Sequence, residues 1–193
     1  MTRYCSPAAV AALLSPGMLV AASDEIVDVN RSVLIVHVGK TGLFSAAGHE
    51  HWVDAPISRG QFNEGAEAQV EFAVDAQKMM VRPDEKTSTK DRAMIQETMQ
   101  SSVLESQKYP EIRFRSTSVT PMGRQAWRVA GTLTLHGVSK AVAVEVRRDG
   151  DVYAGSARLK QTEFGIQPVS IAGGVVKVKN ELDITFKITG LAK

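Results

Sequence analysis

Cysteine is almost missing from this chain of 193 residues. The one cysteine is Cys5, close to the N-terminus. The rest of the chain has no thiol, which excludes disulfides, thiolate metal sites and cysteine nucleophiles there. The sequence also lacks the nucleophile elbow G-x-S-x-G, the dinucleotide-binding motif G-x-G-x-x-G and the phosphate-binding P-loop. We therefore predict a protein that is not an enzyme and carries no cofactor.

Excess charge of either sign is also missing. The chain has 23 Lys and Arg residues against 21 Asp and Glu residues, which gives a formal net charge of +2. A nucleic-acid-binding protein needs basic residues in excess and clustered on one face. The charge balance does not indicate such a face, and we predict no nucleic-acid partner.

Long hydrophobic runs are absent beyond the N-terminus. A run of small and apolar residues from Ala8 to Ala22 follows Arg3 and ends before Ser23 and Asp24. A basic start, an apolar middle and small residues before a polar junction are typical of a secretory signal peptide. We predict a signal peptide over residues 1–23 and a periplasmic location. Residues 24–193 are then one domain without a membrane-spanning segment.

Many segments of the chain alternate apolar and polar residues, as β-strands do. From Val129 to Val146, apolar residues recur at every second position on both sides of a break at His136 and Gly137. Residues 175–188 alternate in the same way. Since successive side chains of a strand point to opposite faces, each such segment has one apolar face. Roughly eight segments of this kind predict a mainly all-β fold built as an antiparallel barrel or sandwich.

One long segment lacks this alternation. Residues 88–104 carry an apolar stripe at helical spacing behind Ser88, a candidate N-cap, and Pro110 ends any helix that reaches Tyr109. We predict a short helical insertion around residues 88–104. The methionines around it either pack the helix onto the barrel, the interpretation we favour, or form an adaptable portal to a cavity: Met79, Met80, Met94 and Met99.

Three motifs point to a known family. They are GTLTLHGVSK at residues 131–140, KYPEIRFRS at residues 108–116, and Phe164-Gly165-Ile166 followed by the closing Gly-Gly-Val-Val run. In this order, from about Asp28 to Ile188, they resemble the YceI-like proteins. The resemblance implies a lipocalin-like antiparallel barrel with a long apolar cavity. It also implies a periplasmic protein that binds polyisoprenoid lipids without a cofactor or catalytic centre.

The alternation assigns apolar residues to the inside of such a barrel. A barrel of about eight strands can hold one elongated ligand. The same residues would serve equally well as a solid core, so the sequence leaves open whether the lumen is hollow. The candidate lumen residues are Phe44, Trp52, Phe62, Phe72, Phe114, Leu133, Leu135, Val144, Leu182, Ile184 and Phe186.

His49 and His51 are the candidate contacts for a ligand head group. They are two positions apart, so in a strand both point to one face. Their segment, residues 42–52, departs from the more basic run that many relatives have there. We expect an isoprenoid lipid or a quinone as the partner, and a homodimer is left open. The alternatives are a metal-dependent or enzymatic protein using both histidines, for which three or four ligands are needed, and a docking partner of a membrane redox protein.

Overall fold

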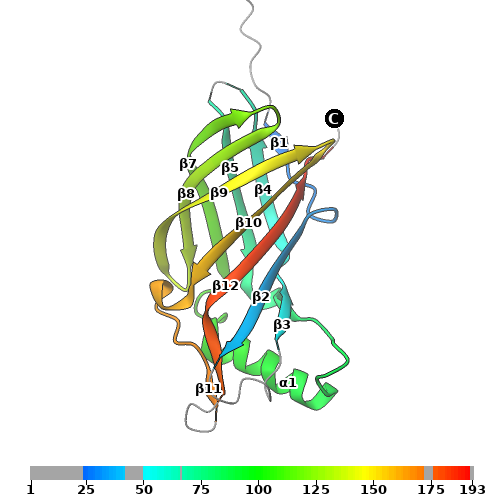
Figure 1. The fold of residues 1–193 in the computed structure, drawn as a ribbon, viewed down its shortest axis with the longest axis vertical. Helices are drawn as coiled ribbons and strands as arrows, with labels where there is room; N and C mark the ends of the chain where they lie inside the picture. Colours follow the sequence, from blue (N-terminus) through cyan, green and yellow to red (C-terminus); the bar gives the residue numbers. More distant parts are fainter. Residues whose placement is uncertain (1–23, 42–49, 66, 172–175, 192–193) are drawn as a thin grey trace, which may run out of the picture.

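The computed structural model describes residues 24–41, 50–65, 67–171 and 176–191. These residues form a curled antiparallel sheet in which eight strands have seven or more residues (Figure 1). The eight long strands are β2 (Val33–Thr41), β4 (Ile57–Asn63), β5 (Gln69–Asp75), β7 (Glu111–Gly123), β8 (Ala126–Leu135), β9 (Val138–Asp149), β10 (Val152–Lys160) and β12 (Val176–Thr189). The predicted mainly-β barrel is thereby confirmed.

The predicted strand count was too low. The described residues form twelve strands, because four short ones join the eight long ones. The short strands are β1 (Glu25–Ile26), β3 (His51–Asp54), β6 (Met80–Val81) and β11 (Ser170–Ile171). A strand of two residues has no period to detect, so alternation in the sequence cannot reveal β1, β6 or β11.

The hairpin β8–β9 has a two-residue turn. Leu135 pairs with Val138, and the turn residues His136 and Gly137 have φ of 53° and 75°. Two consecutive positive φ values are the mark of a type I′ turn, whose twist matches that of the flanking strands. Its register places Val129 opposite Val144, so the apolar faces of both strands point the same way.

The sheet closes where the first and the last of the described residues meet. β1 pairs with β4, and the residues after β1 meet the last residues of β12. The Asp28 N–H donates to the Thr189 carbonyl at 2.8 Å, and the Leu191 N–H donates to the Ile26 carbonyl at 2.8 Å. The β1 segment thus covers two edges that would otherwise expose unpaired backbone groups.

A helix lies at one end of the barrel. Helix α1 (Thr89–Thr98) begins after Ser88, whose Oγ accepts from the Asp91 N–H at 3.1 Å and donates to the Asp91 carboxylate at 2.7 Å. A π-helical turn (Met99–Val103) follows directly. The helical insertion predicted around residues 88–104 is therefore found. Figure 1 shows α1 at the lower end, near β3, while the β9–β10 turn lies at the upper end. In the described part of the chain, α1 and the shorter helical turns are all too short or too polar to cross a membrane.

Candidate ligand cavity

The barrel is hollow. A cavity of about 750 Å³ runs inside it, and all eight long strands contribute lining residues, as does α1. This volume lies within the usual range for small-molecule sites. The sequence left open a solid core or an open lumen, and the structure has the open lumen.

Nine of the candidate lumen residues line this cavity: Phe62, Phe72, Phe114, Leu133, Leu135, Val144, Leu182, Ile184 and Phe186. Phe62, Phe114 and Leu135 are buried, with 7–8% of their surface exposed. Phe44 lies outside the described residues. The alternation of the strands therefore placed these nine side chains on the inner face, and their contact with a ligand stays a prediction.

Trp52 was assigned wrongly. It is 43% exposed, does not line the cavity, and stacks on the His37 ring with 5.0 Å between ring centroids. The reason is the parity of β3: His51 and Val53 line the cavity, so the residue between them points outward. Trp52 belongs to the outer surface of the barrel.

Several lining residues were missed. The inner face of β2 contributes Leu34, Val36 and Val38, and β10 contributes Tyr153 and Leu159. In β2 nearly every position is apolar, so alternation could not tell inside from outside. In β10 apolar residues do alternate in the sequence. The pairing of β10 with β12 shows which of its two faces points inward.

Two glycines let phenylalanine rings lie against the barrel wall. A Cβ at Gly131 would come within 2.6 Å of the Phe114 ring, and a Cβ at Gly155 within 2.6 Å of the Phe186 ring. Each glycine faces inward beside the strand that carries the ring. Since the rings occupy the space of the missing side chains, they leave the centre of the lumen free.

Polar side chains gather where the cavity meets the helix. His51 and Lys40 both line it, and the register explains why: Val38 pairs with His51, and Lys40 continues the inward face of β2 by two residues. The His51 Nδ1 lies 3.9 Å from an Asp84 carboxylate oxygen. Hydrogen bonds, first from the Thr87 hydroxyl and then from the Lys86 and Thr87 N–H groups, lower the pKa of Asp84. This end of the cavity therefore offers an amine and a histidine that has a carboxylate behind it, beside an apolar tube.

His49, the second candidate head-group contact, lies outside the described residues. The described residues include no group of three or more His, Cys, Asp or Glu side chains arranged to hold a metal ion. His51 and Asp84 provide two neighbouring side chains, whereas a typical zinc site has three or four protein ligands.

Two glutamines fasten the helix to the barrel. The Gln96 side chain accepts from the Val81 N–H at 2.8 Å and donates to the Met79 carbonyl at 2.9 Å. The Gln100 amide donates to the carbonyls of Ala76 and Met79, at 3.1 and 2.9 Å. These bonds hold α1 and the π-helical turn against residues 76–81, beside the cavity.

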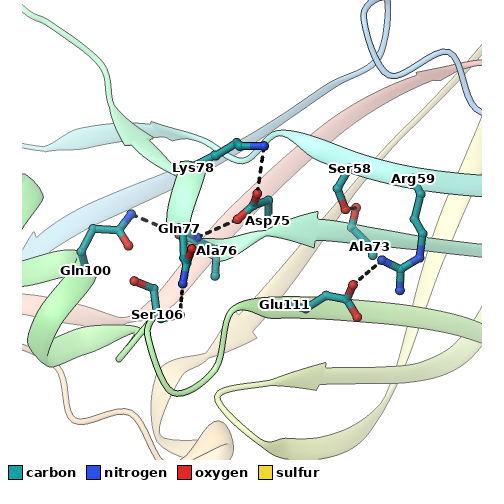
Figure 2. A network of polar contacts seen from close by, with 10 residues as sticks. All are labelled: Ser58, Arg59, Ala73, Asp75, Ala76, Gln77, Lys78, Gln100, Ser106 and Glu111. Atoms are coloured by element: carbon teal, nitrogen blue, oxygen red, sulfur yellow. Dashed lines mark hydrogen bonds and ion pairs between the residues drawn. The ribbon is translucent and has the colours of Figure 1, made fainter.

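The segment that follows β5 also holds the chain that leaves the helical turn. The Asp75 carboxylate accepts from the Gln77 N–H at 3.0 Å and lies 3.2 Å from the Lys78 amine. The Gln77 amide donates to the Ser106 carbonyl at 3.3 Å, as Figure 2 shows. The chain is thus held to the barrel on both sides of the helix.

Three of the four methionines around the helix line the cavity. Met79, Met94 and Met99 line the cavity, whereas Met80 is 63% exposed and does not. Met94 lines the cavity while 53% of its surface is exposed, so the cavity reaches solvent beside α1. The helix end is therefore a mouth.

Comparison with known proteins agrees with this architecture. Residues 27–190 match the YceI-like domain. The chain belongs to the YceI-like family. A UPF0312 protein of Pseudomonas syringae pv. tomato is 33% identical over 90 residues, which are 42% of this chain and 45% of that protein. A UPF0312 protein of Vibrio cholerae is 26% identical over 153 residues, 70% of this chain and 75% of that protein. The chain thus spans less than half of the Pseudomonas relative that it matches.

Solved structures share the fold of this YceI-like chain. BcnA of Burkholderia cenocepacia superposes with a TM-score of 0.64 at 17% identity, covering 84% of this chain and 98% of BcnA. A polyisoprenoid-binding domain from Saccharophagus degradans, implicated in plant cell wall breakdown, superposes with a TM-score of 0.59 at 12% identity, covering 89% and 99%. At these identities the likeness supports the barrel fold alone. The family resemblance and the fold class predicted from the sequence are both confirmed.

Proposed function

We propose that this YceI-like protein binds one long isoprenoid lipid, a polyprenyl or quinone-type molecule, inside its barrel and carries, stores or sequesters it in the periplasm. The observation that carries the proposal is the apolar cavity of about 750 Å³ running through the barrel. The structural neighbour from Saccharophagus degradans is a polyisoprenoid-binding domain, which supports a lipid-binding role. The apolar run of residues 8–22 supports the proposed export.

The apolar lining of the cavity favours an apolar chain as the ligand. Burial of apolar surface contributes about 25 cal/mol per Å², which is roughly 0.8 kcal/mol for each CH₂ group. A hydrocarbon tail gains this along its whole length when it leaves water, while the lining between the two ends offers it few polar groups. Affinity is then expected to come from the tail.

The head group is expected at the helix end. His51 and Lys40 line this part of the cavity and can donate hydrogen bonds to a hydroxyl, a quinone carbonyl or a phosphate. The exposed Met94 marks the same end as the way in. In this orientation the polar end of the lipid stays near water and the tail points toward the β9–β10 turn.

Displacement of a fluorescent polyprenyl analogue tests the proposal. The full chain should bind the analogue in a saturable way, and added polyprenol or long-chain quinone should displace it. Leu133→Asp places a charge on the inner face of β8 and should weaken binding at least tenfold. The matched control is Thr132→Asp, which carries the same charge on the exposed face of the same strand. Absence of saturable binding by the natural chain contradicts the proposal.

A further inference from the structure

At the end of the cavity opposite the helix, side chains from two walls of the barrel meet. Tyr153 of β10 lines the cavity there, and its hydroxyl donates to the Glu64 carboxylate at 2.5 Å. The Arg148 Nη1 donates to both oxygens of that carboxylate, at 3.1 Å each. Glu64 follows β4, whereas Arg148 lies in β9, and three strands separate β4 from β9 in the sheet. These bonds therefore cross the end of the barrel.

Strand parity explains why both charges point inward. Arg148 continues the inner face of β9 by one step beyond Val146, and Glu64 continues that of β4 beyond Phe62. The Arg148 Nε donates to the Gly150 carbonyl at 2.8 Å, which fixes the guanidinium above the Tyr153 ring, 5.4 Å from its centroid. The exposed fractions of Glu64 and Arg148 are 40% and 36%, so the ion pair forms the layer that faces water.

Beneath this ionic layer lies an aromatic one. The Phe62 and Tyr153 rings meet edge to face with 4.9 Å between centroids, and Trp127 lies 6.0 Å from Tyr153. All three rings line the cavity. Burial, together with the Glu64 carboxylate, raises the pKa of the Tyr153 hydroxyl, which therefore remains a protonated donor across the physiological range. The lumen thus ends on three aromatic rings, those of Phe62, Trp127 and Tyr153, which we call the aromatic floor. Glu64 and Arg148 contact this floor from the solvent side.

We propose that the ring of Tyr153, which packs against Phe62 and Trp127, determines the length of the ligand that the barrel accepts. This inference rests on the proposed lipid-binding function. A tail that enters beside α1 meets the aromatic floor, and a longer tail must fold back or leave its head group outside the mouth. The ligand class is therefore an isoprenoid chain with an upper length limit set by this floor.

The test uses unlabelled polyprenols of stepwise increasing isoprene number, measured by displacement of the fluorescent polyprenyl analogue. The natural chain should gain affinity with each added unit up to a limit and then stop gaining. Tyr153→Ala opens the floor and should move that limit to longer polyprenols. Each further isoprene unit that becomes buried should add at least roughly tenfold in affinity, given the value of a buried CH₂.

Two control variants separate the floor from other effects. Tyr153→Phe keeps the ring and loses the bond to Glu64, so its length limit should equal that of the natural chain. Arg158→Ala removes a surface ion pair of the same strand, in which Nε lies 2.6 Å from Asp183, and should also leave the limit unchanged. Tyr153→Leu, which keeps an apolar side chain, replaces the alanine variant if circular dichroism shows that the latter is unfolded.

A tryptophan reports the position of the tail directly. The chain has two tryptophans, and Trp52→Phe leaves Trp127 at the floor as the only emitter. Emission should respond only to polyprenols long enough to reach the floor. An equal length limit in the natural chain and in a folded variant without the Tyr153 ring overturns the inference. Absence of binding at every length in every variant instead contradicts the lipid-binding function on which it rests.

Discussion

Filling the lumen tests whether it is hollow in solution. Ala157 of β10 is half-buried and lines the cavity. Ala157→Phe adds a benzene-sized ring, which occupies roughly 150 Å³, about a fifth of the 750 Å³ available. In a solid core such overpacking costs about 1–3 kcal/mol. In an open lumen the ring instead removes apolar surface from water and suits a strand better than alanine does.

We therefore expect the free energy of unfolding of Ala157→Phe to stay equal to that of the natural chain or to rise by about 1 kcal/mol. Binding of the longest accepted polyprenol should weaken at least tenfold, because a fifth of the room is lost. Urea unfolding of the ligand-free protein measures the first quantity, and analogue displacement measures the second. The matched control, Ser156→Phe, adds the same ring on the exposed face and should leave binding unchanged. Destabilisation by about 1–3 kcal/mol with unchanged binding would refute the hollow lumen.

Three further predictions concern the structure around the cavity. Gln96→Ala leaves the Val81 N–H without its side-chain acceptor and should lower stability by about 1–3 kcal/mol, with faster amide exchange in α1, whereas Glu97→Ala on the exposed side should change neither. Hydrogen bonding to Arg59 lowers the pKa of Glu111 (Figure 2), so its stabilising effect is present above the pKa of the unfolded chain and is lost as the pH falls through the folded pKa. Glu111→Gln should therefore lower the melting temperature at neutral pH, and the difference from the natural chain should vanish in acid. Gly155→Ala should destabilise by about 1–3 kcal/mol, because the new Cβ meets a backbone carbonyl oxygen at 2.5 Å as well as a ring; an unchanged urea midpoint would contradict that packing.

Local patterns determined the parts of the fold that depend on neighbours in sequence. The two-residue turn at His136 and Gly137, the helix behind Ser88 and the inward face of β12 are all readable from period and turn chemistry. The nine lumen residues that lie where they were predicted follow from the same parity. Trp52 was misplaced because it directly follows His51, and adjacent side chains of a strand point to opposite faces, so both cannot face the lumen.

The remaining features depend on contacts between distant segments. Tyr153 and Glu64 are far apart in sequence and meet only because the sheet curls into a barrel. Arg148 has an ordinary basic neighbour in Arg147, and nothing in that pair shows that one side chain turns inward at the end of the barrel. The phenylalanine rings that lie over Gly131 and Gly155 come from neighbouring strands. Which strands are neighbours cannot be inferred from the sequence alone.

Native mass spectrometry of the full chain, expressed in bacteria with export and purified without detergent, tests the central claim most directly. We expect an adduct whose mass equals one polyprenyl or long-chain quinone molecule, lost when Leu133→Asp is introduced and retained with Thr132→Asp. A clean ligand-free mass, together with no adduct after incubation with polyprenols of any length, would contradict it.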